Sequence, residues 1–133
     1  MPHFAHVGLN CRKVSITEAF YGEFFGFERT RVLPVEKGEI VFLTGAGMVL
    51  ELFEAAPDAP DLQEENDGPT GPGFRHLAFQ VDDLDDFLSR VGAPVTKKPI
   101  ELDRFIEGWR AAWIRDPDGR ILEISQGYQP SPC

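Results

Sequence analysis

Cysteine and long apolar runs are both scarce in this chain of 133 residues. The two cysteines, Cys11 and Cys133, form no Cys-x-x-Cys spacing, so the sequence predicts neither a disulfide framework nor a thiolate zinc site. No apolar stretch approaches the roughly 20 residues that a membrane-spanning helix needs. The first residues also lack a basic segment followed by an apolar run, so we expect a cytoplasmic protein that is not bound to a membrane.

Positive charge is also in short supply. The chain has 13 Lys and Arg against 22 Asp and Glu, a formal net charge of −9, which disfavours nucleic acid and anionic lipid as partners. Hydrophobic residues make up 42% of the chain and include 11 Phe, enough for a packed core. We therefore predict one globular domain spanning residues 1–133 that acts on a small molecule.

The pattern of apolar residues predicts the order β-α-β-β-β twice, and hence an α+β fold. In the first half we expect strands at 4–10, 27–33, 40–43 and 48–53, and a helix with a Ser15–Glu18 capping box, an apolar stripe of Ile16, Phe20 and Phe24, and an end at Gly26. In the second half we expect strands at 74–81, around Val95, at 109–115 and at 120–125, and a helix capped by Asp82 or Asp83 and ended by Gly92.

The two halves meet in a segment rich in Pro, Gly and acidic residues, which suits a surface linker. The predicted organisation is a first module at about 1–55, a linker at about 56–72 and a second module at about 73–128. Trp109, Trp113 and Tyr21 are interpreted as packing residues, with Trp109 or Phe53 as the alternative candidate for lining the cavity.

Each half carries a histidine on its first strand and a glutamate on its last. His6 and Glu51 in the first half correspond to His76 and Glu123 in the second, 76 − 6 = 70 and 123 − 51 = 72 positions later. An ionised carboxylate between apolar neighbours is costly to bury unless it meets a cation or hydrogen-bond donors. Any one of these residues alone would be read as an ordinary surface side chain, but the repeated register predicts one metal site with all four as ligands.

This ligand set suits a divalent transition metal. Two neutral imidazoles and two carboxylates match Zn, Ni, Co, Mn or Fe better than calcium, and ligand type does not choose among them. A six-coordinate ion would keep two positions open for a substrate with two adjacent oxygens. This favours enolisation, in which Glu51 or Glu123 leaves the ion and moves the proton.

Three segments resemble those of the vicinal oxygen chelate superfamily, which includes glyoxalase I, extradiol dioxygenases and bleomycin resistance proteins. Ala19–Phe27 is similar to the family's helix-ending segment, His76–Asp83 to the opening of its second module, and Asp116–Ile124 to its closing hairpin. The resemblance implies two βαβββ modules that form a curved mixed sheet around a metal cleft, and a homodimer. It also implies His6, Glu51, His76 and Glu123 as the metal ligands.

Among these families the ligand pattern is most similar to glyoxalase I, because dioxygenases usually have no carboxylate where Glu51 stands. The resemblance therefore implies a metal-dependent lyase or isomerase that acts on a small α-oxygenated carbonyl, or its thiol adduct, through an enediolate. Three alternatives stay open: an Fe(II) ring-cleaving dioxygenase of extradiol type, a non-enzymatic protein that binds an antibiotic or another small molecule, and a thiol transferase that acts on an antibiotic such as fosfomycin, a group that usually lacks the second carboxylate. Arg12, Arg104 and Arg110 are candidates for receiving a substrate carboxylate.

Overall fold

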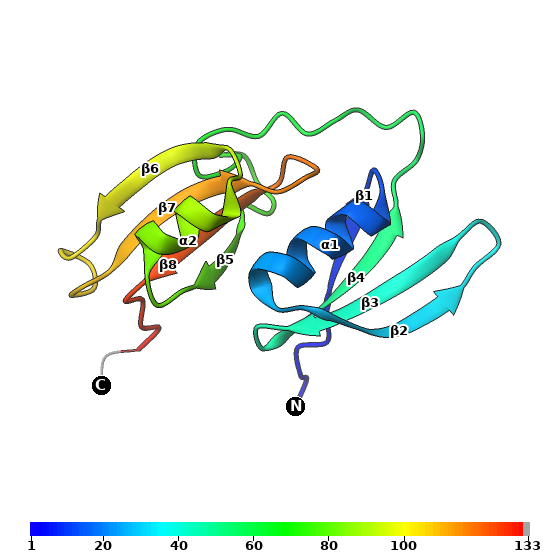
Figure 1. Ribbon diagram of the computed structural model, residues 1–133, viewed down its shortest axis with the longest axis horizontal. Coiled ribbons are helices and arrows are strands. Elements are labelled where there is room, and N and C mark those ends of the chain that lie inside the picture. Colours follow the sequence, from blue (N-terminus) through cyan, green and yellow to red (C-terminus); the bar gives the residue numbers. More distant parts are fainter. Residues whose placement is uncertain (132–133) are drawn as a thin grey trace. The chain divides into compact units, whose positions relative to one another are not determined.

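The computed structural model describes residues 1–131, which divide into two compact units. The first comprises Met1–Asp61 and the second begins at Leu62. Each unit has one four-stranded sheet and one helix, as Figure 1 shows. None of the helices in residues 1–131 is long and apolar enough to cross a membrane.

The first unit has the predicted order of elements. These are β1 (Val7–Cys11), α1 (Val14–Phe25), β2 (Glu28–Pro34), β3 (Glu39–Gly45) and β4 (Met48–Glu54). The sheet has the strand order β1-β4-β3-β2; β1 pairs with β4 in parallel, and the other pairs are antiparallel.

The second unit repeats this topology strand for strand. Its elements are β5 (Leu77–Gln80), α2 (Leu84–Val91), β6 (Val95–Glu101), β7 (Arg110–Arg115) and β8 (Ile121–Gln126). The order β5-β8-β7-β6 again has one parallel pair, β5 with β8, at one edge. The α+β class and the two βαβββ modules are thus confirmed, as two separate four-stranded sheets.

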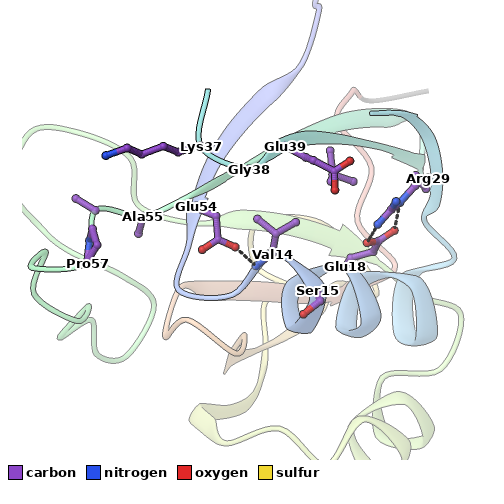
Figure 2. Close-up of a pocket in the computed structure, with 12 residues that line it drawn as sticks. Val14, Ser15, Glu18, Arg29, Lys37, Gly38, Glu39, Glu54, Ala55 and Pro57 are labelled. Carbon is purple, nitrogen blue, oxygen red and sulfur yellow. Dashed lines mark hydrogen bonds and ion pairs between the residues drawn. The ribbon is translucent and has the colours of Figure 1, made fainter. Parts of the chain in front are cut away.

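The start of α1 differs from the prediction. Lys13 is the N-cap and forms no side-chain cap, while Glu18 turns away to bind Arg29 through both carboxylate oxygens, at 2.6 and 2.8 Å. The amide of Val14 instead donates to Glu54 Oε1 at 3.4 Å, from the end of β4 (Figure 2). The Ser15 cap was therefore a wrong prediction, because a distant strand supplies the acceptor that local sequence was expected to provide.

The buried face of α1 also differs from the predicted stripe. Val14, Thr17 and Tyr21 are buried, whereas Ile16 is 52% exposed. The helix ends as predicted, at Gly26 in the left-handed conformation with φ 72°.

Helix α2 agrees more closely with its prediction. Asp83 is the N-cap and accepts a hydrogen bond from the Asp86 amide at 3.0 Å, and Gly92 ends the helix with φ 61°. A second tie comes from β8, where Gln126 Oε1 accepts from the Leu84 amide at 2.9 Å. Both helices are thus fastened at their first residue by the last strand of their own sheet.

The segment between the modules contributes to the second unit from Leu62 onward. Glu64 Oε2 accepts from the Ile121 amide at 3.1 Å, and the Asn66 carbonyl accepts from Thr96 Oγ1 at 2.6 Å. This part of the predicted surface linker is therefore bound to the sheet, and it brings backbone groups close to the site described next.

Candidate metal centre

Each predicted histidine lies immediately before the first parallel strand of its unit. His6 precedes β1 and His76 precedes β5, so both strands begin later than the sequence predicted. In the parallel pairs, Gly8 is in register with Glu51 and Ala78 with Glu123. Each glutamate thus stands beside a small residue located two positions after the histidine, and this leaves room for the two side chains to meet.

In the first unit, His6 Nε2 lies 3.2 Å from Glu51 Oε1. The His6 side chain is 39% exposed and that of Glu51 is 17% exposed. A methyl group added at Gly8 would come within 3.8 Å of Glu51 Oε1, in ordinary contact. The first pair is therefore formed, but it is open to solvent on the histidine side.

In the second unit, His76 Nε2 lies 3.1 Å from Glu123 Oε1, and both side chains are largely buried. The backbone carbonyl of Asp67 accepts a hydrogen bond from His76 Nδ1. Because Nδ1 carries this hydrogen, Nε2 is the ring nitrogen whose lone pair becomes available to a metal ion once its own proton is lost. Both ring nitrogens of His76 therefore have a partner, Asp67 at Nδ1 and Glu123 at Nε2.

Glu123 is held by a further hydrogen bond from its own strand. Ser125 Oγ lies 2.7 Å from Glu123 Oε2, and Trp109 Nε1 lies 3.0 Å from Ser125 Oγ. Trp113 stands opposite Glu123 in the β7–β8 ladder, with its ring centroid 6.3 Å from that of His76. The second carboxylate is therefore oriented by side chains from two strands.

The charges of the second pair favour each other. The hydrogen bond to Glu123 raises the pKa of His76 above its ordinary 6.5; burial opposes this rise and the Asp67 carbonyl adds to it. Burial raises the pKa of Glu123, but hydrogen bonds from His76 and Ser125 outweigh burial, so this pKa lies below the ordinary 4.5. Without a metal, the two groups therefore each favour the charged form of the other, a protonated His76 beside an ionised Glu123.

The geometry of both pairs fits two neighbouring ligands of one divalent ion. Ligand atoms bound at about 2.1 Å and at right angles lie about 3.0 Å apart, whereas a tetrahedral angle separates them by about 3.4 Å. The observed separations of 3.2 and 3.1 Å lie between these two values, so both pairs could hold adjacent positions on one ion. A cation in place of the His76 proton would satisfy the same nitrogen and oxygen.

Neither unit forms a complete centre by itself. Within residues 1–131, no three His, Cys, Asp or Glu side chains gather closely enough to hold a metal ion. The structure thus brings His6 together with Glu51 and His76 together with Glu123.

A cavity of about 390 Å³ adjoins the second pair. Its lining includes His76, Glu123, Ser125, Trp109 and Tyr128. The rings of Trp109 and Tyr128 are in contact, with centroids 5.4 Å apart. Trp109, interpreted from sequence as a packing residue, therefore belongs to the wall of the cavity.

A larger hollow of about 680 Å³ lies in the first unit, at the start of α1 (Figure 2). Two of its charged groups, Arg29 and Glu18, bind each other, and Glu54 is bound to the Val14 amide. Glu54 is three positions after Glu51 on one strand, so the two side chains leave opposite faces of the sheet. This hollow is distinct from the His6–Glu51 pair.

The three candidate arginines are engaged elsewhere. Arg12 binds Asp61 at 3.0 Å, Arg110 binds Glu101 and Asp85, and Arg104 lies over the ring of Phe105. None of them lines the cavity beside His76. Sequence reasoning missed the Asp67 carbonyl because a backbone acceptor leaves no residue-type signal, whereas Ser125 is detectable by its place two residues after Glu123 on the same face.

Comparison with known proteins shows which family the chain belongs to. The family model of the Glyoxalase/Bleomycin resistance protein/Dioxygenase superfamily matches residues 3–124. The chain is 31% identical to the uncharacterized protein YaeR of Escherichia coli over 125 residues, which is 90% of this chain and 92% of YaeR.

Two solved structures illustrate the shared fold. A glyoxalase family protein from Enterococcus faecalis matches with TM-score 0.69 and 30% identity, over 93% of this chain and 97% of that one. The fosfomycin resistance protein FosX from Listeria monocytogenes, in complex with Mn(II) and sulfate, matches with TM-score 0.69 and 19% identity, over 96% of this chain and 94% of that one. With two βαβββ modules and a family model that spans nearly its whole length, the chain belongs to the Glyoxalase/Bleomycin resistance protein/Dioxygenase superfamily.

Proposed function

We propose that the chain is a metal-dependent lyase or isomerase of glyoxalase type, with His6, Glu51, His76 and Glu123 as the ligands of one divalent ion. The observation that carries the proposal is the duplicated pair: in each unit, a histidine nitrogen and a glutamate oxygen stand 3.1–3.2 Å apart at matching places in the sheet. Mn(II), Zn, Ni, Co and Fe all suit this mixed nitrogen and oxygen set.

The proposed reaction moves a proton between adjacent carbons of a small α-oxygenated carbonyl or its thiol adduct. A bound divalent ion supplies a positive charge that stabilises negative charge on the substrate oxygens. A glutamate oxygen accepts the proton of the C–H bond next to the carbonyl; the electrons of that bond form a C=C double bond, and a pair of the C=O bond moves onto the carbonyl oxygen to give an enediolate. The carboxyl group then returns the proton to the former carbonyl carbon, and the proton of the substrate hydroxyl passes to the other oxygen as the new carbonyl forms, so the glutamate ends as it began.

The cavity beside His76 supports an uncharged substrate body. Its lining contains the aromatic rings of Trp109 and Tyr128, and no lysine or arginine. A substrate that carries several carboxylates, as glutathione adducts do, would meet no compensating charge there, and Glu123 would repel it. We therefore propose small, neutral ketols, ketoaldehydes and their adducts with simple thiols as the substrate class.

Metal reconstitution tests the proposal directly. The purified protein is stripped with chelator, titrated by calorimetry with MnCl₂, ZnCl₂, NiCl₂ and CoCl₂, and assayed with hemithioacetals of methylglyoxal. We expect one ion per four-ligand set, and metal-dependent exchange of the α-protons of hydroxyacetone with deuterium in D₂O. Protein that binds no divalent ion, or that binds one without either reaction, contradicts the proposal.

The same preparation examines two of the alternatives. Oxygen uptake with catechols in the presence of Fe(II), retained in Glu51→Ala, would instead support ring cleavage. Ligand binding that is unaffected by chelator would support a non-enzymatic binding protein.

We also propose that the protein is a homodimer. Large aromatic side chains at equivalent places in both units are exposed, Phe4 by 75% and Phe74 by 92%, and contacts between protein surfaces commonly bury such groups. Sedimentation equilibrium measures the mass. Mixing the double variant His6→Ala/Glu51→Ala with His76→Ala/Glu123→Ala then tells whether one ion takes its ligands from one chain or from two, because only a shared site regains metal binding on mixing.

A further inference from the structure

The two carboxylates of the candidate centre differ in what stands two residues after them. Ser125 follows Glu123 on its face of β8, and Phe53 occupies the matching place after Glu51 on β4. A hydroxyl can bind a carboxylate, whereas a phenyl ring cannot. The two halves therefore share the glutamate and differ in the neighbour that can orient it.

The hydrogen bonds at Glu123 have a fixed direction. An indole N–H can only donate, so Trp109 Nε1 donates to Ser125 Oγ, at 3.0 Å. Ser125 has one hydrogen, which points to Glu123 Oε2 at 2.7 Å. With Oε2 engaged and Oε1 facing His76 at 3.1 Å, the carboxylate of Glu123 is held in one orientation.

Glu51 has far fewer restraints. Its one polar side-chain partner in the described part of the chain is His6, itself 39% exposed. The neighbouring strand presents Gly8, and even an added methyl group would only reach ordinary contact with the carboxylate. Glu51 thus has both the freedom and the space to swing.

We infer that Trp109 and Ser125 are positioning residues that hold Glu123 as a stationary one-oxygen ligand, and that Glu51 is the carboxylate that moves and exchanges the substrate proton. This inference rests on the proposed function and assigns the two glutamates different tasks in it. Glu51 takes the proton of the C–H bond next to the substrate carbonyl and becomes a carboxylic acid, while the electrons of that bond form a C=C bond and a C=O pair moves to the carbonyl oxygen. It then gives the proton to the former carbonyl carbon, and the hydroxyl proton passes between the two substrate oxygens as the new carbonyl forms.

The first experiment measures metal affinity, which does not depend on turnover. Mn(II) binding is followed by calorimetry and electron paramagnetic resonance in Ser125→Ala, Trp109→Phe and the matched surface control Ser89→Ala. We expect Ser125→Ala to bind Mn(II) about 10- to 100-fold more weakly, the usual effect of losing an outer partner of a ligand. Trp109→Phe should lose less, because Ser125 keeps its hydroxyl, and Ser89→Ala should match the wild type.

The second experiment transfers the restraint to the other half. Phe53→Ser puts a hydroxyl beside Glu51, where we expect it to hold the mobile carboxylate. The rate of deuterium exchange into hydroxyacetone should fall about 10-fold at saturating substrate, while Mn(II) affinity stays the same or rises. Glu51→Gln should abolish exchange, because an amide cannot accept the proton.

The outcomes separate the two proposals. Wild-type protein that binds no divalent ion contradicts the proposed function itself. Wild-type protein that binds Mn(II) and catalyses exchange, together with Ser125→Ala of unchanged Mn(II) affinity or Phe53→Ser of unchanged exchange rate, overturns the division of roles and leaves the function standing. A drop in thermal stability of Ser125→Ala without a change in Mn(II) affinity counts against the inference in the same way.

Discussion

The two halves of the candidate centre have the same skeleton but different surroundings. In both, a histidine just before a parallel edge strand meets a glutamate on the adjoining strand. In the second half, the Asp67 carbonyl and Ser125 hold both members, while the first half leaves His6 open to solvent. The two halves thus share the His–Glu pair, and their different neighbours restrain the second pair more than the first.

Removing either glutamate should have the largest effect on Mn(II) affinity and tests most directly whether the two halves are equivalent. Glu123→Ala and Glu51→Ala should each weaken Mn(II) binding by more than about 100-fold, since the loss of outer partners alone costs 10- to 100-fold. Calorimetry on metal-free protein measures both. Loss of Fe(II) binding in Glu123→Ala, with Glu51→Ala close to wild type, would contradict a four-ligand centre and favour the dioxygenase alternative.

The closing hairpins of the two sheets offer a second contrast. In the second unit the buried Asp116 accepts from the amides of Asp118 and Arg120 and binds the Arg120 guanidinium at 2.6 Å. Asp116→Ala should cost about 3 kcal/mol of unfolding free energy, because it leaves a buried cation and two amides without this acceptor.

The matching turn of the first unit serves as the control for that variant. It has Ala46 at φ 49°, a strained conformation for a residue with a side chain. Ala46→Gly should therefore be neutral or stabilising by up to about 1 kcal/mol. Urea titration measures the free energy of unfolding of Asp116→Ala and Ala46→Gly. Equal destabilisation by the two variants would contradict the view that each effect arises from the contacts of its own turn.

Lowering the pH should weaken metal binding by the second half, whereas protonation of His76 should stabilise the metal-free protein. Because the pKa of His76 is raised above 6.5, a metal ion must displace its proton. Mn(II) affinity should then fall by up to about tenfold per pH unit as the pH drops below this raised pKa. Calorimetry across pH 5–9 measures the slope, and a flat profile would contradict His76 as a ligand.

The stability of the metal-free protein should depend on pH through the same two groups, His76 and Glu123. The raised pKa of His76 adds stability that is complete below pH 6.5 and is lost as the pH rises through that pKa. The lowered pKa of Glu123 adds stability that is present above pH 4.5 and is lost as the pH falls through its own pKa. Thermal melts in chelator should therefore show the pair's contribution at its greatest between pH 4.5 and 6.5.

The ties at the helix starts should give the smallest effect. Gln126→Ala removes a 2.9 Å bond to the Leu84 amide and should cost about 1 kcal/mol. Glu54→Ala removes a 3.4 Å bond to the Val14 amide and should cost less, roughly 0.5 kcal/mol. Urea titration ranks the two, and a larger loss for Glu54→Ala would reverse the expected order.

Much of the fold was visible in the sequence because local rules govern it. Gly26 and Gly92 end their helices in the left-handed conformation that glycine tolerates, and Asp83 caps α2 within its own turn. The start and the buried face of α1 were missed because Glu54, 40 residues away from Val14, replaces the local cap. Tertiary contacts of this kind leave no trace in the spacing of neighbouring residues.

The candidate site followed the same division. Repetition of His and Glu at matching places predicted one site of four ligands, and the structure brings these residues together as two pairs, His6 with Glu51 and His76 with Glu123. The difference between the pairs was not predicted, because it arises from the Asp67 carbonyl and from a bond between Trp109 and Ser125 that joins the start of β7 to β8.

One feature of both sheets links ligand and helix. Glu54 and Gln126 each follow their ligand by three residues, 54 − 51 = 3 and 126 − 123 = 3, and each holds the first amide of the helix on the opposite face. Three positions along one strand thus separate each proposed metal ligand from the residue that binds the helix. Under the proposed function, we expect metal binding to slow hydrogen exchange at the amides of Val14 and Leu84, and this exchange would report occupancy separately in each half.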